Sequence, residues 1–151
     1  MSRLCVAIDI SATPAQVWQV VEPIEDHVSW MHDAVAIHFQ TDRHRGVGTA
    51  FLCDTKVGPF KLVDRMEITE WTPNAAIGVR HVGLVTGTGR FMLTPIDLGR
   101  RTRFGWDESL VFPWWLGGPA GAVVGGRLVL RRIWKRNLRT LKHLVEHRFT
   151  P

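Results

Sequence analysis

An acidic residue interrupts an otherwise apolar pattern near the end of the chain. Side chains alternate between the two faces of a strand, and in the predicted strand 102–112 Glu108 falls on the apolar face. The other residues on that face are Thr102, Phe104, Trp106, Leu110 and Phe112. A carboxylate there is costly unless it is paired or protonated, which makes Glu108 a candidate acid or base. The alternative is that Glu108 lies near the strand end and reaches water or an arginine of the C-terminal helix.

A histidine is placed in the same way in the predicted strand 77–82. His81 shares a face with Ile77 and Val79, whereas Arg80 and Val82 take the other face. A histidine inside a cavity can donate, accept or transfer a proton near neutral pH. Glu108 and His81 are therefore the candidate catalytic residues, as a proton-transfer pair. The alternative for His81 is a hydrogen-bonded histidine of the core or rim.

Two further polar residues stand in strand-like patterns. Asp64 alternates with apolar residues, so it faces either inward or a bulge or open end of the sheet. These apolar neighbours are Leu62, Met66 and Ile68. His38 is ambiguous, because the inner face of its strand is assigned to other residues. Those residues are Val35, Ile37 and Phe39.

One short motif resembles a metal site. Residues 143–147 match the H-x-x-E-H pattern of a zinc-peptidase class, and two histidines four apart on a helix can ligate zinc. Lys142 and Arg148 make the segment cationic, which opposes a metal dication. A basic end that complements the helix dipole explains the segment more simply. We expect no metal and no cofactor.

Composition narrows the class of protein. The 151 residues are 45% apolar, which excludes a disordered chain, and the length suits one domain over 1–151. Two cysteines exclude a disulfide framework and a cysteine-rich zinc site. The chain holds no Tyr, so no tyrosine can act as a general acid.

The positive charge is concentrated in one segment. The net charge is +5, from 19 Lys or Arg and 14 Asp or Glu. Residues 127–148 hold eight of the basic residues and one acid, Glu146, giving +7, so the remainder is 11 basic against 13 acidic, or −2. The charge therefore belongs to one helix and argues only weakly for nucleic-acid binding by the whole domain.

The elements that position these residues follow from periodicity and turn signals. Alternation over 4–10 predicts a strand. Thr13, Pro14 and Gln16 then predict a capped helix that Pro23 ends, and a second short helix covers 24–31. Six strands follow without intervening helices, which predicts an antiparallel sheet. Their predicted ranges are 35–40, 50–57, 60–71, 77–82, 87–96 and 102–112.

The end of the chain predicts one long helix over 119–147. Leu130, Trp134, Leu138, Leu141 and Val145 recur at intervals of three and four, which marks one buried face. The preceding stretch 109–126 carries no formal charge and lies at the lower edge of a membrane-spanning length. Its five Gly and its prolines favour a strand end, a loop and a helix start instead.

The ordered set of elements resembles the helix-grip arrangement of the START-like (SRPBCC) superfamily, in particular its polyketide cyclase/dehydrase branch. Residues 8–18 (IDISATPAQVW) are similar to the family's opening strand, turn and Val-Trp helix, and Trp30 to its tryptophan before the next strand. Residues 91–95 and 102–106 resemble its last two strands, and 138–142 the end of its long helix.

This resemblance implies an α+β fold: a curved seven-stranded antiparallel sheet around the long C-terminal helix, with two short helices after the first strand. It also implies a cavity between sheet and helix that takes a hydrophobic or amphipathic small molecule. The expected wall and ligand-binding residues are Trp30, Phe51, Met66, His81, Phe91, Leu93, Phe104, Trp106, Glu108, Leu130 and Trp134.

Three functions follow, in this order. Binding or transport of a small apolar ligand comes first. A polyketide cyclase, aromatase or dehydratase is the alternative, which the absence of Tyr and the scarcity of inward polar residues disfavour. The third is an interaction module on the basic helix, which binds an anionic membrane surface together with Trp114 and Trp115; nucleic acid is the less favoured partner because no aromatic RNA-stacking motif accompanies the charges.

The N-terminal residues show no basic segment followed by an apolar run, so we expect no signal peptide and a cytoplasmic protein with reduced thiols. The glycines at 117, 121 and 125, beside Trp114 and Trp115, suggest a mobile gate at the mouth of the cavity. The alternative is an ordinary loop packed on the sheet.

Overall fold

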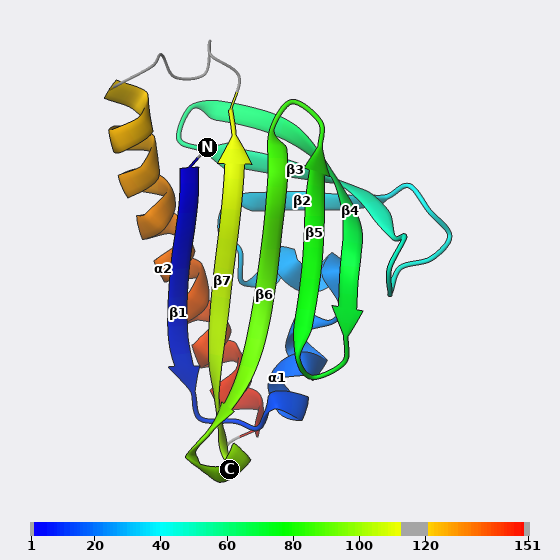
Figure 1. Cartoon of the computed structure of the whole chain (residues 1–151), viewed down its shortest axis with the longest axis vertical. Coiled ribbons are helices and arrows are strands. Elements are labelled where there is room, and N and C mark those ends of the chain that lie inside the picture. Colours follow the sequence, from blue (N-terminus) through cyan, green and yellow to red (C-terminus); the bar gives the residue numbers. More distant parts are fainter. Residues whose placement is uncertain (1, 113–120, 150–151) are drawn as a thin grey trace.

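The computed structural model describes the backbone of residues 2–112 and 121–149, and side chains from 3 to 112 and from 126 to 149. Seven strands form one antiparallel sheet in the order β1-β7-β6-β5-β4-β3-β2. They are β1 (Ser2–Ile10), β2 (Ala34–Phe39), β3 (Ala50–Val57), β4 (Phe60–Thr72), β5 (Ala76–Val82), β6 (Thr86–Ile96) and β7 (Arg101–Val111). The sheet curves beside the long helix α2 (Gly121–Phe149), as Figure 1 shows. The predicted helix-grip fold is confirmed.

The first helix forms where its capping residues predict. Helix α1 (Pro14–Val21) has Thr13 as N-cap, and the hydroxyl of Thr13 accepts from the Gln16 backbone while the Gln16 side chain accepts from the Thr13 N–H. Both halves of the predicted capping box are therefore present. The next segment is a 3₁₀ helix, η1 (Ile24–Ser29), which ends two residues before the predicted end at residue 31. Its N–H groups reach carbonyls three residues back, as from Asp26 to Pro23.

Helix α2 packs against the sheet along its predicted stripe. Trp134, Leu138, Leu141 and Val145 are buried in the common core, and Leu130 is partly buried at its edge. The helix runs two residues further than predicted, to Phe149. The prediction that it begins at residue 119 concerns a position outside the described residues.

One buried polar residue on α2 was not predicted from the sequence. Asn137 is fully buried; its carbonyl oxygen accepts from the His32 backbone N–H at 2.9 Å, and its amide donates to Asp33 at 2.7 Å. These bonds fasten the helix to the segment between η1 and β2. Because both partners are satisfied by one side chain, loss of Asn137 removes two partly buried hydrogen bonds at once.

The orientation predicted for one residue of β2 is wrong. Val35 was expected to face inward with Ile37, but it is 59% exposed. The pairing of β2 with β3 shifts register between Ala34 and Ala36, which turns Val35 outward. His38 is exposed and lies 3.3 Å from Asp54 on the outer face.

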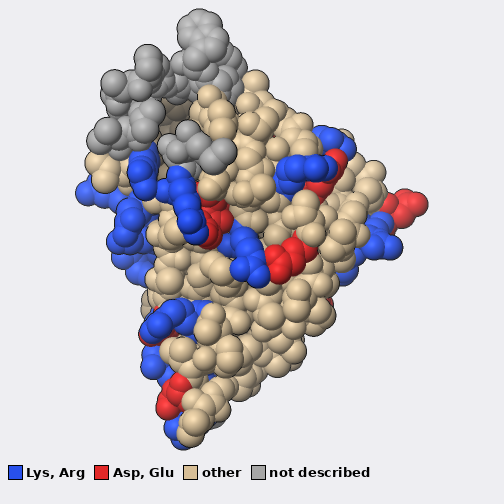
Figure 2. All heavy atoms as spheres, in the orientation of Figure 1, with Lys and Arg blue, Asp and Glu red and all other residues tan. Residues whose placement is uncertain are grey.

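The basic residues of α2 lie mainly on its exposed side. Arg127, Arg131, Arg132, Lys135 and Arg136 are exposed, and Figure 2 shows blue side chains gathered along the edge where α2 lies. Trp114, Trp115 and the predicted gate around Gly117 lie outside the described residues. Within the described helices, none is both long and apolar enough to cross a membrane.

We predict that Asn137→Ala lowers the free energy of unfolding by about 2 kcal/mol, because it leaves the His32 N–H and Asp33 without their partner. The matched control Arg136→Ala, on the exposed side of the same helix, changes it by less than about 0.5 kcal/mol. Urea denaturation of both variants measures the difference. Equal stability of the two variants would show that Asn137 does not fasten the helix.

Candidate ligand-binding cavity

A cavity of about 130 Å³ is lined by η1, strands β2 to β7 and the inner side of α2. Most of its wall is apolar. The apolar lining includes Ile24, Met31, Ile37, Phe51, Leu62, Met66, Ile68, Ile77, Val79, Phe91, Trp106, Leu110, Leu130 and Trp134. An apolar cavity of similar size, about 150 Å³, can hold one benzene ring, so the space suits an aromatic ring or a short branched chain.

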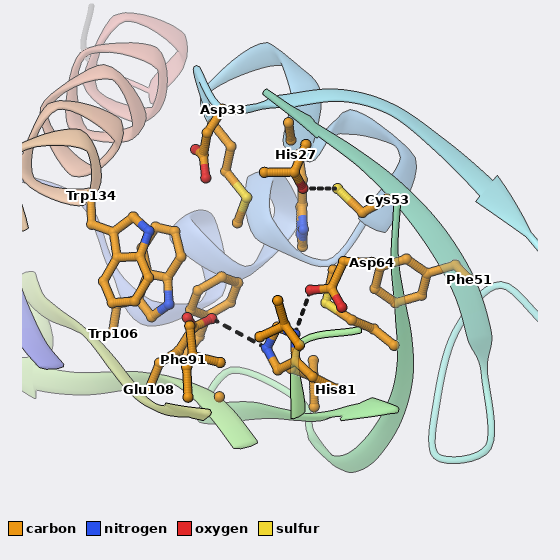
Figure 3. Close-up of a pocket in the computed structure, with 18 of the residues that line it drawn as sticks. His27, Asp33, Phe51, Cys53, Asp64, His81, Phe91, Trp106, Glu108 and Trp134 are labelled. Carbon is orange, nitrogen blue, oxygen red and sulfur yellow. Dashed lines mark hydrogen bonds and ion pairs between the residues drawn. The ribbon is translucent and has the colours of Figure 1, made fainter. Parts of the chain in front are cut away.

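Two strands bring a carboxylate and an imidazole together in this wall. Asp64 on β4 and His81 on β5 share the inner face, and Met66 is the residue paired with His81 in the sheet. The Asp64 carboxylate lies 2.5 Å from Nδ1 of His81 (Figure 3). Nδ1 therefore carries a proton and donates it to Asp64. Of the two positions left open for Asp64, the structure shows the inward one.

A second carboxylate approaches the other side of the ring. Glu108 on β7 points inward, and its Oε1 lies 3.7 Å from His81 Nε2, a distance for an ion pair but too long for a hydrogen bond. Strand β6 lies between the two residues, and Gly89, paired with Glu108, leaves room for the carboxylate. A Cβ at Gly89 would lie 2.9 Å from Glu108 Oε1. Because Gly89 has no side chain, the Glu108 side chain on β7 can extend over β6 toward His81 on β5.

The two carboxylates decide the charge of His81. Burial lowers the pKa of the imidazole, but the hydrogen bond to Asp64 and the proximity of Glu108 outweigh it and raise the pKa to about 9. His81 is therefore an imidazolium at neutral pH. Its charge compensates one of the two carboxylates, and Figure 3 shows it between them.

Several polar atoms in the cavity wall lack a partner. His81 Nε2, Asp64 Oδ1 and Trp106 Nε1 are buried and have no hydrogen bond to any residue that the structure describes. The His81 side chain is only 6% exposed. Buried polar groups in proteins are nearly always paired, so these atoms are available to a polar group of a bound molecule.

Further polar residues line the cavity without having been predicted, among them His27, Asp33 and Cys53. His27 on η1 donates Nε2–H to the Val21 carbonyl at 2.7 Å, and burial lowers its pKa to about 4, so it is neutral. Burial raises the pKa of the Cys53 thiol to about 11, so the thiol is protonated. Asp33 follows η1 and is bonded to Asn137. No periodicity marks His27 or Asp33, because they lie in η1 and a turn.

The structure divides the predicted wall residues into two groups. Eight line the cavity: Phe51, Met66, His81, Phe91, Trp106, Glu108, Leu130 and Trp134. The other three, Trp30, Leu93 and Phe104, are buried in the core and are not among the residues that line this cavity. Trp30 packs edge-on against Phe104 and Trp106, at centroid distances of 6.3 and 6.2 Å. Trp30 and Phe104 therefore contribute aromatic packing to the core, and Leu93 is a buried aliphatic residue of the same core.

The H-x-x-E-H segment, residues 143–147, lies on α2. Glu146 is paired with Lys142 at 2.9 Å, and His143 and His147 are exposed. In the described part of the chain there is no cluster of three or more His, Cys, Asp or Glu side chains suited to a metal ion.

Chemically, the cavity can hold an apolar group and present it with a proton donor. The His81 Nε2–H is the free donor, Asp64 fixes the ring orientation, and Glu108 is an acceptor beside it. Such a group can bind a polar atom of a ligand or exchange a proton with it.

Several solved structures share this fold at low identity. A protein from Thermus thermophilus matches with a TM-score of 0.79 and 14% identity over 99% of this chain and 100% of its own. A START superfamily protein from Mycobacterium smegmatis gives 0.75 and 13%, over 96% and 97%. The Zhui aromatase/cyclase of a Streptomyces species gives 0.74 and 14%, over 97% and 94%. At these identities the likeness establishes the fold alone.

Comparison with curated proteins finds no match. A family model does match, and it covers residues 1–146, nearly the whole chain. Together with the sheet, the long helix and the apolar cavity, this match shows that the chain belongs to the polyketide cyclase/dehydrase and lipid transport family.

Proposed function

We propose that this protein binds an apolar or amphipathic small molecule in the cavity between the sheet and α2. The observation that carries the proposal is an apolar wall in which buried polar atoms of His81 and Asp64 have no partner among the described residues. The wall removes apolar surface of the ligand from water, at about 25 cal/mol per Å². The polar atoms fix the orientation of one polar group. The family description, which includes lipid transport, is consistent with this role.

A second candidate is an acid–base enzyme of the cyclase or dehydratase type. The observation that favours it is that His81 lies between Asp64 and the cavity. The Asp64 carboxylate accepts from Nδ1–H of His81, and Nε2 faces the space where a substrate would lie. A protonated His81 can give a proton to a carbonyl or hydroxyl oxygen, and Glu108 can accept one. The similarity in fold to an aromatase/cyclase agrees with this candidate.

We predict that protein purified from its native host carries a bound apolar compound, visible by native mass spectrometry. Val79→Trp, which fills the cavity, should remove that compound. Val63→Trp, at a position 56% exposed on β4, should retain it. Wild-type protein that is empty from every growth condition, or a compound retained by Val79→Trp, would contradict the proposal.

We predict that stability falls as pH rises from about 6.5 to about 9. The pKa of His81 is raised in the folded state, so its stabilising charge is present below the unfolded-state value and is lost as pH rises through the folded one. The loss is on the order of 3 kcal/mol for a shift of this size. Urea denaturation across this range measures it. Asp64→Asn should flatten the curve, and an unchanged curve in that variant would contradict the pairing.

For the enzyme candidate, the prediction concerns a poly-β-ketone thioester as substrate. His81→Gln should lower the rate of its cyclisation or dehydration by at least about 100-fold, as expected for loss of a general acid. The control His38→Gln, on the outer face, should keep the rate. Chromatography of the products measures the rate in each variant. Unchanged turnover in His81→Gln would show that His81 is not the catalytic residue.

A further inference from the structure

The cavity holds more negative charge than positive charge. Asp33, Asp64 and Glu108 all line it, and His81 is the one imidazolium among them. His27 is neutral. Arg90 also lines the cavity, and its guanidinium is bonded to Glu70 at exposed positions. The residues 113–125, whose side chains the structure does not describe, include no Lys or Arg. They cannot supply a compensating side-chain charge.

An uncompensated buried charge is costly, and the cost falls when an opposite charge enters. His81, 6% exposed, neutralises one of its two neighbouring carboxylates and leaves the other in excess. Asp64 Oδ1 is buried and lacks a donor among the described residues. Glu108 is held at 3.7 Å from the imidazole, without a hydrogen bond between them. Both carboxylates can therefore accept from a donor that a ligand brings.

The aromatic wall beside the carboxylates suits the same ligand charge. Trp106 and Trp134 are stacked at 4.8 Å with an angle of 16° between their planes, and Phe91 meets Trp106 edge-on at 5.2 Å. Aromatic faces attract ammonium groups, most strongly when water is removed. In Figure 3 Trp106 and Trp134 lie on one side of Glu108 and the His81–Asp64 pair on the other.

We propose that the cavity selects apolar molecules that end in a protonated amine, whose ammonium group donates to Glu108 or Asp64 while its ring or short chain packs against Trp106 and Phe91. This inference rests on the proposed small-molecule binding and adds the chemical class of the ligand. A carboxylate ligand of the same shape meets like charge and is rejected. A neutral alcohol of the same shape fits the space, but it lacks the positive charge and so binds more weakly than the amine.

Three compounds with one phenyl ring and a short chain test the proposal: 2-phenylethylamine, 2-phenylethanol and 3-phenylpropanoate. Titration calorimetry with the wild-type chain at pH 7 should show the amine binding at least about tenfold more tightly than the alcohol, the gain expected of a charge-assisted hydrogen bond. The carboxylate should show no binding. An alcohol that binds as tightly as the amine, or a carboxylate that binds more tightly, would overturn the inference and leave small-molecule binding intact.

Two variants connect the preference to the cluster. Glu108→Gln and Asp64→Asn each keep the shape and remove one charge, so each should weaken the amine about tenfold and leave the alcohol within about twofold. The control Asp107→Asn lies on the outer face of the same strand, paired with Arg3, and should keep the preference. A preference unchanged in both cavity variants overturns the assignment. If none of the three compounds binds the wild-type protein, the proposed function fails for ring-sized ligands, and this inference fails with it.

Discussion

The interior of this protein is organised around one electrostatic constraint. Two carboxylates share an apolar cavity with one imidazole, whose positive charge must compensate their negative charge. Asp64, His81 and Glu108 come from β4, β5 and β7, so their contact exists only when the sheet has its native register. Gly89 on β6 is part of the same requirement, because a side chain there would collide with Glu108. A sheet curved against α2 keeps the three groups away from water, and this makes their charges matter.

The cavity and the core differ in what their aromatic residues do. Trp30 and Phe104 fill space behind the wall, where packing density sets stability. Trp106 and Trp134 are stacked on each other and line the cavity, where a bound molecule would complete the packing. The two proposed roles, carrier and enzyme, differ in whether His81 Nε2 only binds a polar atom of the ligand or also transfers a proton to it.

Local patterns predicted much of this arrangement from the sequence. Alternation around Glu108 and His81 indicated an inward face, alternation around Asp64 left an inward face or a bulge open, and the capping residues marked the start of α1. The pairing of His81 with Asp64 and Glu108 depends on register across four strands, which no local pattern encodes. Asn137 interrupts an apolar stripe without a signal for its partners, and Val35 turns outward at a register shift visible only in the paired strands. The roles of His27 and Asp33 likewise depend on contacts made in three dimensions.

A crystal structure of the protein with 2-phenylethylamine bound would test most directly whether the buried cluster binds a ligand's polar group. We expect the phenyl ring against Trp106 and Phe91, with the nitrogen within about 3 Å of an oxygen of Glu108 or Asp64. A ligand bound only on the outer surface, or one whose nitrogen points away from both carboxylates, would contradict this expectation.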